Sequence, residues 1–195
     1  ASIAIIDKDT DQARRTAEEA ERRGASKVHV VGADVSNQAA ADDACRGAIA
    51  RLGGIDVLVT NVGVNRPAFF LETDPSTWDQ LLSVNLTSVM SCTRAVLPAM
   101  IGQGRGSIVA TASTAALGEY RQSVYAAAKA GVVAFIRTIA LEYGRNGVRA
   151  NLVAPGLTLP EDASALGAQS LWQDRDAIMN DAQIGYVEKQ TPLRR

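Results

Sequence analysis

The sequence predicts an α/β protein in which a doubly wound parallel sheet lies between two layers of helices. Three observations predict this fold class. Short runs of β-branched and aliphatic residues alternate with long helical patterns along the chain. The strand-like runs are mostly apolar, as expected for strands that helices cover on both faces. Polar or turn-forming residues follow these runs, at the sheet edge where such folds bind ligands.

The elements alternate regularly along the chain. Five segments have the short apolar pattern of a strand, and they are Ile3–Ile6, Lys27–Val31, Ile55–Thr60, Ser107–Thr111 and Val148–Val153. Four longer segments have the apolar spacing of helices, and they are Thr10–Arg23, Gln38–Leu52, Thr77–Met100 and Ser123–Tyr143. Gly24 and Gly53-Gly54 end the first two helices, because glycine readily adopts the left-handed conformation found at helix ends. Asp74-Pro75-Ser76 is a start signal for the third helix.

We expect residues 1–195 to form a single domain, because no repeat, low-complexity tract or linker divides the chain. A hydrophobic content of 47 % over 195 residues is enough for a sizeable core. The segment Glu161–Lys189 differs from the rest because it is polar and only partly helical in pattern. We interpret it as an insertion over the sheet edge, either a lid that covers the substrate or a mobile excursion.

Composition narrows the classes of function. The net charge of −1 gives no sign of binding to nucleic acid or to an anionic membrane. No apolar run approaches the length of a membrane span, and no signal peptide opens the chain. Cys45 and Cys92 both lie in helical patterns and suggest no disulfide scaffold, so we expect a cytoplasmic protein. With His29 as the one histidine, we expect metal-free chemistry on a small molecule.

Residues at the strand ends mark the expected ligand site, because doubly wound sheets bind ligands beyond the carboxyl ends of their strands. In strand order these residues are Asp7, Asp34-Val35, Asn61 with Gly63, Ser113, and Pro155-Gly156. Packing requirements alone do not account for so many polar and turn-forming residues at one edge. The sequence therefore predicts a binding site there.

Tyr125 and Lys129 are four residues apart in a helical segment, so their side chains rise from the same face, one turn apart. A nearby positive charge favours the phenolate and lowers the pKa of a phenol. Such a pair can act as an acid–base unit. The same spacing also occurs by chance on helix surfaces, so the surrounding motifs decide between the two interpretations.

Five motifs occur in a fixed order around this pair. They are Thr60-Asn61-Val62-Gly63 at a strand end, Val84-Asn85-Leu86 in a helix, the strand Ser107–Ser113, the segment Tyr125–Lys129, and Gly147–Gly156. In these motifs the chain resembles the short-chain dehydrogenase/reductase family over nearly its whole length. The resemblance implies a Rossmann-type fold. It also implies an NAD(P)-dependent oxidoreductase that interconverts a secondary alcohol and a ketone by hydride transfer.

The same resemblance implies a role for each catalytic candidate. Tyr125 would be the general acid/base. Lys129, together with the positive charge of an oxidised nicotinamide, would lower the pKa of that phenol, and Lys129 would also hold the nicotinamide ribose hydroxyls. Ser113 would hydrogen-bond the substrate oxygen, with Thr114 as a less favoured alternative. Asn85 would organise a water that links Lys129 to solvent. An asparagine is locally unfavourable inside a helix, which makes Asn85 a functional candidate.

Further residues are expected to contact the cofactor. Asp7 could accept hydrogen bonds from the adenosine ribose and repel a 2′-phosphate, which favours NAD over NADP. Alternatively, Asp7 could cap the following helix, as Asp9 or Thr10 also could. The other expected contacts are Asp34 and Val35 at the adenine, Asn61 and Gly63 along the backbone, Tyr125 and Lys129 at the ribose, and Pro155, Gly156 and Thr158 near the carboxamide.

The glycine-rich phosphate loop of that family is not found in the sequence, which opens at Ala1-Ser2-Ile3 inside what resembles the second strand of the family. In the strand order 3-2-1-4-5-6, a sheet without its first strand consists of two half-sheets with unpaired inner edges. The hypothesis is that the chain is part of a protein of about 250 residues. Two other functions stay open, a non-catalytic scaffold subunit and an isomerase or dehydratase on the same fold.

The resemblance also implies a homodimer or homotetramer, in which the helices Thr77–Met100 and Ser123–Tyr143 pair across an interface. The substrate pocket should be lined by Val64–Phe70, Leu117–Arg121 and Glu161–Lys189. Arg66 or Arg121 could contact a carboxylate or phosphate of the substrate. Either arginine could equally be solvated.

Overall fold

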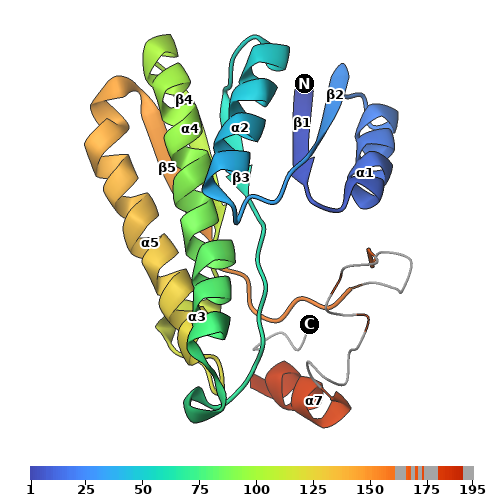
Figure 1. Ribbon diagram of the computed structural model, residues 1–195, viewed down its shortest axis with the longest axis vertical. Helices are drawn as coiled ribbons and strands as arrows, with labels where there is room; N and C mark the ends of the chain where they lie inside the picture. Colours follow the sequence, from blue (N-terminus) through green and yellow to red (C-terminus); the bar gives the residue numbers. More distant parts are fainter. Residues whose placement is uncertain (161–165, 168–169, 171–172, 174–179, 191–195) are drawn as a thin grey trace. The chain divides into compact units, whose positions relative to one another are not determined.

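The computed structural model describes residues 1–160, 166–167, 170, 173 and 180–190 of the chain (Figure 1). The chain divides into two units, Ala1–Pro155 and Gly156–Arg195. The first unit holds the five strands found among the described residues. The second unit contains α7 (Asp181–Gln190). Most of the insertion expected at Glu161–Lys189 lies outside the described residues.

The strands of the first unit are all paired in parallel, as the sequence predicts. They are β1 (Ser2–Asp7), β2 (Lys27–Gly32), β3 (Val57–Thr60), β4 (Gly106–Thr111) and β5 (Val148–Val153). The described strands form two sheets, one of β1 and β2 and one in the order β3-β4-β5. The expectation of two half-sheets is therefore confirmed. Within the described residues, β1 and β3 each pair along one edge only.

The helices agree closely with the sequence pattern. They are α1 (Thr10–Arg22), α2 (Gln38–Leu52), α3 (Pro75–Leu82), α4 (Ser88–Gln103) and α5 (Ser123–Tyr143). The start signal at Asp74 is confirmed, because its side chain accepts a hydrogen bond from the Thr77 amide and Pro75 follows it. The unexpected feature is a π-helical turn, Ser83–Thr87, between α3 and α4.

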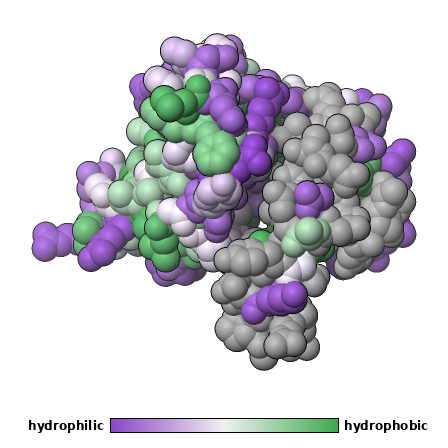
Figure 2. Space-filling model, turned by 90° about the horizontal axis from the view of Figure 1, so that it is seen from below, coloured by the Kyte–Doolittle hydropathy of each residue, from purple (hydrophilic) through white to green (hydrophobic). Residues whose placement is uncertain are grey.

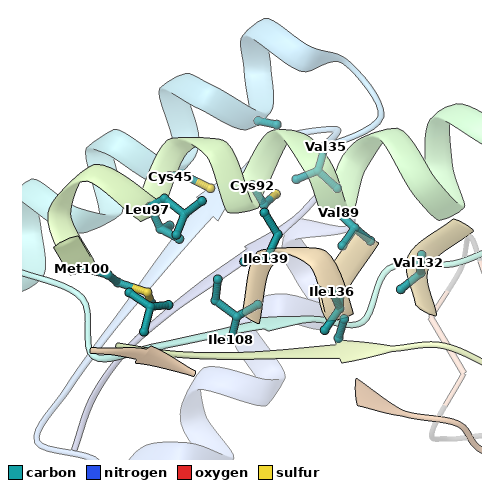
Figure 3. Packing of buried hydrophobic residues seen from close by; sticks show 14 of the residues in the cluster. Val35, Cys45, Val89, Cys92, Leu97, Met100, Ile108, Val132, Ile136 and Ile139 are labelled. Carbon is teal, nitrogen blue, oxygen red and sulfur yellow. The ribbon is translucent and has the colours of Figure 1, made fainter. Parts of the chain in front are cut away.

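Helices α1 and α2 lie on opposite sides of the sheet formed by β1 and β2 (Figure 1). The main core lies where α2, α4 and α5 pack together over one face of the other sheet (Figure 3). Strand register explains which face is buried, since Leu58, Ile108 and Ala150 stand opposite one another in adjacent strands. Val57 and Val59 point to the other face and are 53 % and 62 % exposed.

Cys45 of α2 and Cys92 of α4 face each other in this core (Figure 3), and both are free, buried thiols. A hydrogen bond to Cys92, together with burial, raises the pKa of the Cys45 thiol above its ordinary value. The same hydrogen bond lowers the pKa of Cys92. The absence of a disulfide between these two cysteines agrees with the sequence.

Two helical stretches, residues 75–103 and 123–146, are long and apolar enough to cross a membrane by length and composition alone. This finding differs from the expectation that no apolar run approaches the length of a membrane span. Both contribute buried residues to the core, including Val96 and Ile136. A helix that packs in the core of a soluble protein has the same length and composition.

Candidate active site

Asn85 connects the π-helical turn to the segment that follows β3. Its side chain is fully buried and makes three hydrogen bonds. The amide oxygen accepts from the Val64 N–H at 3.2 Å, and the amide nitrogen donates to the carbonyls of Val64 at 2.8 Å and Leu81 at 2.9 Å. A π-helical turn widens the helix locally and often lies at a functional site. Asn85 is therefore a fixed part of the site floor.

Lys129 lies in the second turn of α5 and is only 2 % exposed. Its ammonium donates a hydrogen bond to the Thr111 carbonyl at 2.8 Å. A Cβ atom placed on Gly63 would lie 3.0 Å from Asn85 Oδ1 and 3.5 Å from Lys129 Nζ, so these three residues meet. Burial lowers the pKa of Lys129 below its ordinary value, because the charged form loses hydration.

Ser113 and Tyr125 also come together. Ser113 directly follows Ala112 at the end of β4, and its hydroxyl accepts a hydrogen bond from the Ala115 amide at 3.2 Å. The Ser113 hydroxyl also lies close enough to the Tyr125 phenol to lower the pKa of that phenol. Thr114 is exposed. This contact favours Ser113 over Thr114 as the hydroxyl that works with the phenol.

Lys129 alone does not bring the pKa of Tyr125 below its ordinary value. The expected lowering by Lys129 together with an oxidised nicotinamide stays a prediction. Burial raises the pKa of this phenol, and the nearby Ser113 hydroxyl opposes that effect. The ammonium of Lys129 lies over the ring, 5.7 Å from its centroid, and is hydrogen-bonded to the Thr111 carbonyl. In this arrangement desolvation of the phenolate outweighs the attraction of the cation.

We therefore expect the Tyr125 phenol of the free protein to titrate above its ordinary pKa of about 10. The measurement is the ultraviolet absorbance of phenolate against pH, taken as the difference between wild type and Tyr125→Phe. Because the folded pKa is raised, the stability due to this group is present below the unfolded pKa and lost as pH rises through the folded one. A difference titration with a midpoint at or below the unfolded value would contradict the effect of burial.

Three residues expected to contact the cofactor lie near the ends of β1 and β2, namely Asp7, Asp34 and Val35. Asp9 is the N-cap of α1, since its side chain accepts from the Gln12 amide, while Asp7 accepts from the Asp9 amide at 2.9 Å. The alternative role of Asp7 as helix cap is therefore wrong. Asp34 binds the amide and hydroxyl of Ser36, and these hydrogen bonds lower the pKa of its carboxyl.

The Val35 side chain is 7 % exposed and packs in the hydrophobic core. It follows Asp34 along the chain but points into the interface of α2 and α4, as Figure 3 shows. An apolar residue beside a core helix gains more from burial than from a solvent-facing ligand surface. The expected contact of Val35 with the adenine ring stays a prediction.

The remaining residues expected to contact the cofactor belong to different units of the chain. Asn61 accepts a hydrogen bond from the Thr111 hydroxyl at 2.9 Å, which joins the ends of β3 and β4. The Pro155 carbonyl accepts from the Thr114 amide at 3.0 Å, close to Ser113 in the chain. Gly156 and Thr158 belong to the second unit. Their expected contact with the cofactor stays a prediction.

Sequence reasoning missed three residues that build the site. Thr111 holds both Lys129, through its carbonyl, and Asn61, through its hydroxyl. Asn65 donates to the side chain of Gln122 at 2.8 Å, which connects the loop after β3 to the start of α5. Thr111 could have been found from the sequence, because it is a polar residue at the end of a strand. No signal in the sequence indicated the pairing of Asn65 with Gln122.

The expected pocket segments 64–70 and 117–121 do come together. The Ala68 amide donates to the Arg121 carbonyl at 2.8 Å, and the rings of Phe69 and Tyr120 pack edge to face at 5.5 Å. Both rings are exposed, as are Phe70, Leu71 and Leu117. Hydrophobic and hydrophilic residues are mixed on the face seen in Figure 2. These residues provide a partly apolar wall next to Tyr125.

Parallel strands with helices in between, and polar residues at their carboxyl ends, define a Rossmann-type α/β protein. The family model described as short chain dehydrogenase matches residues 1–170. The chain therefore belongs to the short-chain dehydrogenase family.

Relatives show what this chain is similar to. It is 40 % identical to (2S)-[(R)-hydroxy(phenyl)methyl]succinyl-CoA dehydrogenase subunit BbsD of Thauera aromatica over 80 % of this chain and 63 % of that protein. It is 37 % identical to "Inactive 2-(S)-hydroxypropyl-CoM dehydrogenase 2" of Xanthobacter autotrophicus over 90 % of this chain and 74 % of that protein. The chain thus spans less than two thirds of the length of the Thauera protein.

Among solved structures, a gluconate 5-dehydrogenase from Burkholderia cenocepacia J2315 in complex with NADP and tartrate is similar to this chain. The TM-score is 0.85 at 30 % sequence identity, and the match covers 100 % of this chain and 72 % of that structure. Likeness at this level supports the same fold and family.

Proposed function

We propose that the protein is an NAD(P)-dependent oxidoreductase that interconverts a secondary alcohol and a ketone. The observation that carries this proposal is the convergence of three groups: the buried Lys129 ammonium lies over the Tyr125 ring, and Ser113 lies close enough to the phenol to lower its pKa. A phenol, a hydroxyl and a buried ammonium can move a proton and stabilise charge on a substrate oxygen without a metal ion.

The residues present fit a nicotinamide cofactor. The Lys129 ammonium has three donors, and one of them is used by the Thr111 carbonyl. Donors of Lys129 could hold ribose hydroxyls, and Gly63 lets the backbone come close, since a side chain there would press on Asn85 and Lys129. The bound cofactor supplies or accepts the hydride.

The chain's own residues handle the proton and the orientation of the substrate. Tyr125 takes a proton from the alcohol oxygen, or gives one to the carbonyl oxygen in the reverse direction. Ser113 donates a hydrogen bond to the same oxygen and steadies charge that develops there. Asn85 holds the backbone of Val64 in place through its amide, so that the loop after β3 keeps its shape. Its proposed part in ordering a water beside Lys129 is compatible with this position.

The test is oxidation of secondary alcohols by the purified full-length protein, with NADH absorbance and ketone measured together. We expect one NADH per ketone. A non-catalytic subunit, the alternative that an inactive relative of 37 % identity favours, would form neither. An isomerase or dehydratase would convert substrate without net NADH, which would also contradict the proposal.

Our preference for NAD over NADP rests on Asp7, whose carboxylate lies at the end of β1 and is half-buried. A carboxylate there repels a 2′-phosphate. We expect Asp7→Ser to shift the ratio of kcat/KM values for NAD and NADP by about tenfold or more towards NADP. Asp11→Ser, which removes an exposed carboxylate from the first turn of α1, is the control and should leave the ratio unchanged. An unchanged ratio in Asp7→Ser would remove Asp7 from cofactor selection.

The proposal extends to assembly and location. Exposed apolar side chains on the two long helices, Met90 of α4 and Leu141 of α5, fit an interface between copies in a homodimer or homotetramer. Two free buried thiols fit a reducing cytoplasm.

A further inference from the structure

A small cavity lies beside Tyr125, between the loop after β3 and the start of α5. Its lining includes Asn65, Arg66, Arg121 and Tyr125. The volume of ≈ 10 Å³ has room for about one water-sized group, such as one oxygen of a carboxylate. Two of these residues each have a buried polar atom, Asn65 Oδ1 and Arg121 Nε, without a hydrogen-bond partner within the described part of the chain.

Arg121 is held in an unusual conformation at this cavity. Among the described residues it is the one non-glycine residue with positive φ, at 59°. Its carbonyl accepts the Ala68 amide, and its guanidinium carbon lies 5.3 Å from the centroid of the Phe69 ring. A positive φ in a residue with a long side chain is unfavourable and persists where surrounding contacts enforce it. The surroundings therefore hold the guanidinium at the cavity.

The charge of Arg121 is not balanced nearby. None of the ion pairs between described residues includes it. A buried donor without an acceptor is unfavourable, and more so when it carries charge. A ligand that brings an anionic acceptor would satisfy Nε. The edge of a guanidinium formed by Nε and one Nη matches the two oxygens of a carboxylate.

Asn65 limits what else can lie in the cavity. Its amide nitrogen donates a hydrogen bond to Gln122, and its amide oxygen is left to accept a hydrogen bond from a ligand or a water. A water or a hydroxyl can donate that hydrogen bond, but a second carboxylate oxygen cannot. The two unpartnered atoms are thus an acceptor on Asn65 and a donor on the cationic side chain of Arg121, and an anionic acceptor suits the donor of Arg121.

We propose that Arg121 binds a carboxylate group of the substrate, so that the protein acts on hydroxy acids and the corresponding oxo acids in preference to neutral alcohols. This inference rests on the proposed oxidoreductase function and names the substrate class for it. The exposed rings of Phe69 and Tyr120 border Arg121 on the outside and suit an apolar body between the carboxylate and the carbinol.

The turnover test compares secondary hydroxy acids with their primary amides, with one to three carbons between carboxyl and carbinol. In wild type we expect kcat/KM for the best acid to exceed that of its amide by about 30-fold or more. Arg121→Gln should abolish this preference mainly through KM, and Arg121→Lys should keep part of it. The control Arg66→Gln removes an exposed positive charge from the same cavity lining and should keep the preference.

A binding test does not depend on turnover. Butyrate and butyramide are titrated into the full-length protein by nuclear magnetic resonance. Wild type should bind butyrate at least about tenfold more tightly than butyramide, and Arg121→Gln should bind both equally. Circular dichroism and Tm verify that the variant is folded.

Equal binding of butyrate by wild type and folded Arg121→Gln would overturn the inference, since the cavity would then hold a water only. Loss of the preference in Arg66→Gln instead would also overturn it. If no alcohol is oxidised at all, the proposed function fails, while the butyrate titration still decides the role of Arg121.

Discussion

Replacing Tyr125 with phenylalanine is expected to lower kcat for alcohol oxidation by at least about two orders of magnitude, the usual contribution of a general acid–base group. The change removes the hydroxyl that lies close to Ser113 and leaves the ring in place next to Lys129. The phenol is half-buried, and its loss should alter the free energy of unfolding by no more than about 1 kcal/mol, the net value of one hydrogen bond.

Tyr143→Phe is the matched control, because it makes the same chemical change at the other end of α5. It should keep kcat within about twofold of wild type, since its hydroxyl is not part of the proposed chemistry. Turnover of Tyr125→Phe close to that of wild type would remove Tyr125 from its role. A similar loss in Tyr143→Phe would show that helix packing, and not proton transfer, explains the effect.

Local signals explain how much of the fold the sequence predicts. The bounds of Gln38–Leu52, Ser123–Tyr143 and Val148–Val153 agree with the structure. The first of these helices lies between an N-cap, Asn37, and a left-handed C-cap, Gly53, and both signals can be read in the sequence. Parallel pairing followed from the apolar strands and intervening helices.

The π-helical turn at Ser83–Thr87 could not be predicted in the same way. The apolar spacing continues through it, so the pattern favours one uninterrupted helix. Its buried asparagine bonds the backbone of Val64, which is 21 residues away in the chain. A contact of this kind depends on tertiary structure and leaves no periodic signal.

The candidate site shows the same division. Spacing singled out Tyr125 and Lys129, a strand end singled out Ser113, and the resemblance to the family gave all three their expected roles. The Thr111 carbonyl that holds Lys129 was not predicted, because any residue type provides a carbonyl. Val35 was assigned to the adenine by resemblance, whereas its side chain contributes to the core. The strained backbone of Arg121 follows from packing of two loops and has no sequence signature.

Asn85→Leu is expected to have the largest effect on stability, about 3 kcal/mol in the free energy of unfolding. Leucine has a similar size and fills the fully buried place of Asn85, but it leaves the half-buried amide and carbonyl of Val64 without their partner. Each such group costs about 1–3 kcal/mol. The corresponding fall in Tm is roughly 6–12 °C for a chain of this size. Asn146→Leu, at an exposed position, is the control and should shift Tm by no more than about 2 °C.

Asn85→Asp distinguishes the contribution of the Asn85 hydrogen bonds from that of its packing, because aspartate has nearly the same shape as asparagine. At neutral pH the introduced carboxylate still accepts the Val64 amide, but it faces the carbonyl oxygens of Val64 and Leu81, to which the amide nitrogen donates in wild type. Burial and these oxygens raise the folded pKa of the introduced carboxyl above its unfolded value of about 3.9. Stability relative to wild type should therefore recover as pH falls through the folded pKa, and it should be lost as pH rises. Chemical denaturation of both proteins from neutral to acidic pH measures this difference. A constant difference across that range would mean that Asn85 acts only by filling space.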